Sequence, residues 1–190
     1  MASNAPARPD WDRLYETAAA QEGLFTTQQA AAAGYSPQLL VHYTHTGKIV
    51  RVRRGTYRLV HFPPGEHEEL VAAWLWSEQA GVISHQSALA LHGLSDVLPA
   101  QVHLTLPQDW RSRRFRVPAD FVLHHADIPS SDRTWFGAVP TTNARRSLND
   151  CAKSGLSPDQ LQRAAQQALR RGLVTQSELS DVDAALSSFG

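Results

Sequence analysis

The sequence predicts an α+β chain with two domains, and three observations lead to this prediction. Residues 10–47 show the apolar spacing of helices, with capping residues where the helices begin and end. Residues 48–59 alternate apolar and basic residues, which is typical of a β-hairpin. A Pro-Pro-Gly break at residues 63–65 then leads into a longer region of mixed helical and strand-like runs. We therefore expect domains at residues 10–62 and 66–190, preceded by a flexible arm at residues 1–9.

The first domain begins with three predicted helices. One covers residues 10–21, and a short second helix is opened by Thr26 and Gln29 in capping-box spacing. The third begins after Ser36 as N-cap and ends at Gly47. Two helices joined by a tight turn and followed at once by a β-hairpin are typical of a winged helix-turn-helix, in which the hairpin is the wing.

Positive charge is concentrated on the predicted wing. The whole chain has 18 basic and 18 acidic residues, but residues 23–63 contain five basic residues and no acidic residue. The five are Lys48, Arg51, Arg53, Arg54 and Arg58. Such a local field favours contact with DNA phosphates. A sheet edge protected by charge and a protein-docking module are the alternatives, and the absence of acids argues against both.

Helical spacing divides the third helix into two faces. Leu40, Tyr43 and Thr44 share one stripe, which we assign to the core. The opposite face and the N-cap are predicted to meet the major groove of DNA; these residues are Ser36, Gln38, Val41, His42 and His45. Gln38 can form paired hydrogen bonds with adenine, worth about 1–3 kcal/mol of discrimination. The basic wing residues would contribute affinity more than sequence choice.

The second domain is predicted to be a small sheet surrounded by helices. Strand-like runs occupy residues 101–107, 113–118 and 120–126. Helical patterns occupy residues 66–81, 85–93, 141–155 and 157–172, and Thr175 with Glu178 opens a last helix. A basic cluster consists of Arg111, Arg113, Arg114 and Arg116. It is either a solvated turn or an interaction surface for a partner.

No catalytic pattern is evident in the sequence. It has no Gly-x-Ser-x-Gly elbow, no phosphate loop and no carboxylate spacing of a nuclease. Ser84, His85 and Asp96 are close in sequence, but nothing supplies an oxyanion hole. His42 and His45 lie one helical turn apart without a neighbouring Cys or carboxylate, so we do not predict a metal site there. We expect a binding protein that is not an enzyme and uses no cofactor or metal.

The composition favours a cytoplasmic protein. Cys151 is the only cysteine, which excludes an internal disulfide and fits a reducing compartment. No apolar run reaches the roughly 18–20 residues that span a bilayer, and the N-terminus has no signal-peptide core.

Four phrases resemble one family. "GLFTTQQAAAAGYSPQLLVHYTHTGKIVRVRRGTYRL" is similar to the N-terminal winged helix-turn-helix of the AbiEi antitoxins of bacterial type IV toxin–antitoxin systems. "VISHQSALALHGLSD", "VHLTLP" and "VPTTNARRSLNDCA" extend the resemblance into the second half, so that it spans about residues 14–186. The sequence departs from the family in its recognition helix, where many members have more Arg.

The resemblance implies a DNA-binding antitoxin. Its first domain would bind inverted repeats in its own promoter and repress the operon, using the recognition-helix and wing residues named above. Its second domain would counteract a cognate toxin similar to nucleotidyltransferases, directly or indirectly. Two alternatives remain: a stand-alone winged-helix regulator whose second domain senses a ligand or a protein, and an enzyme with a DNA-binding module.

Overall fold

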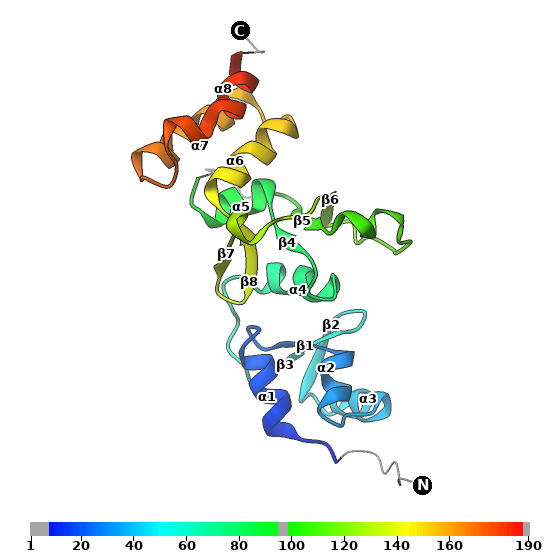
Figure 1. Ribbon diagram of the computed structural model, residues 1–190. Coiled ribbons are helices and arrows are strands. Elements are labelled where there is room, and N and C mark those ends of the chain that lie inside the picture. The colour runs from blue at the N-terminus through cyan, green and yellow to red at the C-terminus, as the bar shows by residue number, and fades with distance from the viewer. Residues whose placement is uncertain (1–7, 95–98, 188–190) are drawn as a thin grey trace. The chain divides into compact units, whose positions relative to one another are not determined.

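The computed structural model describes residues 8–94 and 99–187 (Figure 1). The chain is α+β, as the sequence predicts, with helices and two small sheets. It divides into two compact units, residues 1–79 and 80–190. Most of the arm expected at residues 1–9 lies outside the described residues, as does Asp96.

The N-terminal unit is a winged helix-turn-helix. Its elements are α1 (Trp11–Ala19), β1 (Leu24–Thr26), α2 (Thr27–Ala32), α3 (Pro37–His45), β2 (Ile49–Arg53), β3 (Thr56–Leu59) and α4 (Glu68–Trp76). The strands form an antiparallel sheet in the order β1-β3-β2. The predicted caps are confirmed: Thr26 and Gln29 form a capping box, and the Ser36 side chain accepts a hydrogen bond from the backbone N–H of Leu39.

Helices α1, α2 and α3 and the sheet of this unit share one core. Leu14 of α1, Leu40 of α3 and Ile49 of β2 are buried and belong to a single apolar cluster. Gly23, which precedes β1, has a φ of +84°, and a Cβ there would lie 2.7 Å from the Phe62 ring. Glycine is therefore required at this position by both backbone conformation and space.

Helix α4 belongs to the N-terminal unit, although the sequence suggests a boundary at residues 63–65. Glu22 accepts a hydrogen bond from the backbone N–H of His67 (3.1 Å). Gln79 donates to Gln21 (3.1 Å). These polar contacts fasten both ends of α4 to the α1–β1 segment, so the compact unit ends after Gln79 rather than at the prolines.

The C-terminal unit contains a mixed sheet and its helices. Its elements are β4 (Val82–Ile83), α5 (His85–Leu91), β5 (Val102–Leu106), η1 (Gln108–Ser112), β6 (Phe121–His125), η2 (Ser130–Asp132), β7 (Arg133–Phe136), β8 (Val139–Thr142), α6 (Ala144–Lys153), α7 (Pro158–Arg170), η3 (Gln176–Leu179) and α8 (Ser180–Ser187). The strand order is β6-β5-β4-β8-β7. The β5–β6 and β4–β8 pairs are parallel, and the others are antiparallel.

One predicted strand and one predicted helix start in this unit are wrong, and two strands were missed. Residues 113–118 form no strand, because no neighbouring strand pairs with them. Residues 141–142, expected in a helix, end β8, and α6 begins only after Asn143 as N-cap. The short strands β4 and β7 were not predicted.

Helices α6, α7 and α8 pack together with α5 around a second apolar core. Leu89, Leu148, Leu161 and Val182 are buried in it, one from each helix. Within the described ranges, no helix combines the length and apolarity needed to cross a bilayer.

Candidate nucleic-acid interface

Helix α3 presents most of its predicted outer face to solvent. Gln38, Val41, His42 and His45 are exposed, and Val41 keeps 55% of its surface accessible. Leu40 is buried, and the Tyr43 ring is half-buried against the rings of other residues of the unit. The helix therefore has one face fixed to the core and one face free to enter a groove.

Two aromatic contacts and one backbone hydrogen bond fix α3 relative to the rest of the unit. The Tyr43 ring lies edge-on to Trp11, with centroids 6.4 Å apart, and also contacts Tyr35 at 5.8 Å. The backbone N–H of Lys48 donates to the Tyr43 carbonyl (3.0 Å), so the wing starts directly from the end of α3. The Lys48 ammonium lies 4.9 Å from the centroid of the Tyr43 ring.

The tip of the wing is held to the start of α2. Gly55 has a φ of +80°, which the tight turn between β2 and β3 requires. Its carbonyl accepts hydrogen bonds from the backbone N–H (2.9 Å) and the hydroxyl (3.3 Å) of Thr27. The wing is thus anchored at its base by α3 and at its tip by α2, which preorganises its cations.

The five basic residues of the wing region differ in accessibility. Lys48, Arg51 and Arg54 are exposed, and Arg53 is half-buried. The Arg51 side chain donates to the Arg53 carbonyl (3.3 Å) from an exposed position. Phosphates can reach the three exposed cations without any rearrangement of the core.

Arg58 has partners within its own unit. It donates to the Phe62 carbonyl (3.0 Å) and lies 3.4 Å from the Glu68 carboxylate of α4. Only 18% of its side chain is exposed. The structure thus gives Arg58 a role in joining the wing to α4, in contrast to its three exposed neighbours.

One exposed residue of this surface is predicted by sequence spacing to lie in the core. Thr44, expected in the core, is exposed and donates its hydroxyl hydrogen bond back to the Leu40 carbonyl (2.8 Å). Val50 and Val52 on β2 keep 43% and 38% of their surface accessible. Period-2 alternation normally indicates a buried apolar face, but these two valines of β2 are only partly covered. They add apolar surface between the wing cations.

The second basic cluster lies in the C-terminal unit. Arg111, Arg113, Arg114 and Arg116 are all exposed. The Arg113 guanidinium lies 3.7 Å from the centroid of the Trp110 ring, which fixes its position through a cation–π contact. The role of this loop as an interaction surface for a partner stays a prediction.

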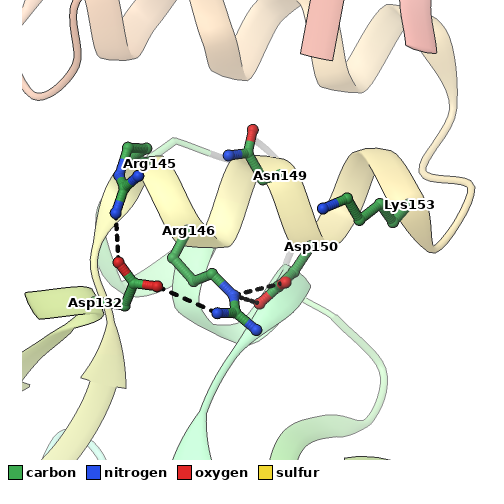
Figure 2. A pocket seen from close by; sticks show the side chains of 6 residues that line it. All are labelled: Asp132, Arg145, Arg146, Asn149, Asp150 and Lys153. Atoms are coloured by element: carbon green, nitrogen blue, oxygen red, sulfur yellow. Dashed lines mark hydrogen bonds and ion pairs between the residues drawn. The ribbon is translucent and has the colours of Figure 1, made fainter. Parts of the chain in front are cut away.

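A third set of arginines, on α6, is held in ion pairs, as Figure 2 shows. Arg146 bridges Asp132 (3.2 Å) and Asp150 (2.8 Å), and Arg145 also pairs with Asp132. Burial raises the pKa of Asp150, against the opposing effect of Arg146. The ion pairs with Asp132 fasten η2 to α6. Because the two arginines are neutralised within the unit, they are poor candidates for phosphate binding.

Comparison with known proteins supports the N-terminal assignment. Residues 12–60 match the family described as "Transcriptional regulator, AbiEi antitoxin". No curated protein matches the chain. Among solved structures, the RV2827C protein from Mycobacterium tuberculosis is similar at 16% identity and a TM-score of 0.46, over 100% of this chain and 82% of that chain. The matched family segment covers α1 through β3, which are the winged helix-turn-helix elements described above. Residues 12–60 of this chain are therefore similar to the AbiEi antitoxins, a family of transcriptional regulators.

Proposed function

We propose that the chain is a cytoplasmic DNA-binding antitoxin that represses its own toxin–antitoxin operon and counteracts a cognate nucleotidyltransferase-like toxin. One observation carries the proposal: the family match coincides with a winged helix-turn-helix whose exposed cations lie in an acid-free stretch. The role is that of a binding protein, without catalysis of its own.

The proposed DNA contact uses α3 and the wing together. The exposed face of α3 enters the major groove, where Gln38 contacts base edges. Lys48, Arg51 and Arg54 contact phosphates on the adjacent backbone. The anchoring of the wing at both ends holds its backbone in place before DNA binds, so little backbone ordering opposes the contact. Two copies on an inverted repeat would read the two half-sites symmetrically.

An operon reporter tests the repressor half of this proposal. The promoter upstream of the chain's own reading frame drives a reporter in cells that supply the protein in trans. The variant Arg51→Ala/Arg54→Ala is expected to lose repression. Arg163→Ala/Arg170→Ala removes two exposed cations from α7 and serves as the matched control, which should repress like the wild type. A reporter that the wild-type protein leaves fully active would refute autorepression.

Co-expression with the product of the adjacent reading frame tests the antitoxin half. The proposal predicts that the neighbouring product slows growth and that this chain restores it. Repression without any protection would instead support the second candidate, a stand-alone regulator whose C-terminal unit senses a ligand or a protein. That candidate is favoured by one observation, which is that the family match ends at residue 60 and leaves the C-terminal unit unmatched.

A further inference from the structure

Three histidines from three separate elements converge in the C-terminal unit. His85 is the first residue of α5, His103 lies in β5 and His124 lies in β6. One ring nitrogen of each lies within 4.8 Å of the others. The His103 Nδ1 and His124 Nε2 atoms are 3.1 Å apart, and the His85 ring stacks on the His124 ring with centroids 3.4 Å apart.

Sheet register brings these side chains to one face. β5 and β6 pair in parallel with Thr105 opposite His124. His103 lies two residues before Thr105, so its side chain is on the same face as that of His124. The backbone N–H of Ser84 donates to the His103 carbonyl (3.0 Å), which places the start of α5 beside this part of β5.

The His85 side chain is held by a serine hydroxyl. Its Nδ1 lies 2.9 Å from the Ser84 Oγ, which also accepts a hydrogen bond from the Thr105 hydroxyl (2.7 Å). In the tautomer with the proton on Nδ1, Ser84 accepts from both neighbours and the lone pair of Nε2 is free. An outer hydrogen bond of this kind fixes the tautomer and the orientation of metal-binding histidines. His85 also has a φ of 51°, an uncommon conformation for a residue with a side chain.

The cluster is in the neutral form that binds metals. Burial is the main cause that lowers the pKa of His85 to about 3 and that of His124 to about 4. Burial also lowers the pKa of His103. The positive charge of Arg146 contributes to the shift at His85, but this charge is itself paired with Asp132 and Asp150. At neutral pH no proton must therefore be displaced from an imidazolium before a metal binds.

We propose that His85, His103 and His124 bind a divalent transition-metal ion of the Zn²⁺ class, with water in the remaining position. Zinc–nitrogen bonds of about 2.0–2.1 Å imply roughly 3.3 Å between ligand nitrogens in a tetrahedral site. The separation between the His103 and His124 nitrogens is close to this value. The His85 ring is stacked on the His124 ring in the structure and would turn out of the stack to complete the set. Imidazole ligands without carboxylates suit Zn²⁺ and exclude Mg²⁺ and Ca²⁺. The ion would tie α5 to β5 and β6.

Zinc titration of the full chain tests this site. After treatment with a chelator and its removal, isothermal titration calorimetry with Zn²⁺ should show one saturable site per chain. Co²⁺ should give the visible absorption bands of a tetrahedral complex. Ser84→Ala removes an outer-shell hydrogen-bond partner and should weaken Zn²⁺ binding by ~10–100-fold. His124→Gln removes a ligand and should weaken Zn²⁺ binding by more than this.

Two controls separate this cluster from the other histidines. His125→Gln changes the neighbouring residue of β6, and His42→Gln/His45→Gln removes the pair on α3; both should bind Zn²⁺ like the wild type. Circular dichroism checks that each variant is folded. Imidazole ¹⁵N shifts of the wild-type chain identify the ligands without any substitution. The proposal is overturned if Zn²⁺ does not saturate one site, if it shifts other histidines only, or if a folded His124→Gln binds as tightly as the wild type.

Discussion

The wing arginines offer a quantitative prediction, because their accessibility differs so clearly. Arg51 and Arg54 are exposed, whereas Arg58 is occupied by Glu68 and the Phe62 carbonyl. If the exposed pair contacts phosphates, Arg51→Ala/Arg54→Ala should weaken binding to every DNA sequence. The loss should shrink as salt rises, since the lost contacts act through counterion release.

The size of the effect follows from the number of contacts. Each phosphate contact contributes about 0.9 to the slope of log K against log salt, so two contacts account for about 1.8. Between about 50 and about 200 mM salt, the wild-type protein should therefore lose about tenfold more affinity than the double variant. Fluorescence anisotropy with one labelled duplex over a series of salt concentrations measures both slopes.

Arg58→Gln is the matched control within the same wing. Its salt slope should equal that of the wild type, while the free energy of unfolding in urea should fall by about 1–3 kcal/mol, because a charge-assisted hydrogen bond and an ion pair are lost. Equal slopes for the wild type and Arg51→Ala/Arg54→Ala would refute the phosphate assignment. A reduced slope for Arg58→Gln would show that Arg58 leaves Glu68 to bind DNA.

Three further predictions concern single residues. Gln38→Ala should reduce discrimination among operator variants by about 1–3 kcal/mol at its base position while leaving the salt slope unchanged, as competition binding would show. Burial lowers the pKa of His92, so as pH falls below about 6.5 the His92 imidazole gains a proton in the unfolded chain before it does in the folded one. The free energy of unfolding should therefore fall with pH in this range. The accompanying decrease in the urea midpoint should be smaller for His92→Gln than for the wild type. Burial raises the pKa of the Cys151 thiol to about 12, so iodoacetamide at mildly alkaline pH should modify it only when urea unfolds the C-terminal unit.

Local signals in the sequence predicted the N-terminal unit well. The caps at Thr26 and Ser36 depend on residues three positions apart, and both form as expected. Gly55 at the wing turn likewise adopts the left-handed conformation that its position demands. These features are decided by a few neighbouring residues, which is why spacing and residue type suffice to find them.

Features that depend on distant partners were missed. β4 has two residues and exists because β5 and β8 flank it, whereas residues 113–118 alternate correctly but have no neighbouring strand. The partner of Arg58 is Glu68, which lies beyond the expected domain boundary. The histidine cluster brings together His85 and His124, 39 positions apart, through parallel pairing that no local pattern encodes.

Sequence-specific binding to the chain's own upstream region is the most direct test of the central claim. The full-length protein is titrated against a labelled duplex from that region and against a shuffled duplex of equal length and composition, at about 0.15 M salt. We predict binding to the upstream duplex at least ~10³-fold tighter than to the shuffled one. Equal affinity for the two duplexes, or no binding to either, would contradict the assignment of α3 and the wing to operator recognition.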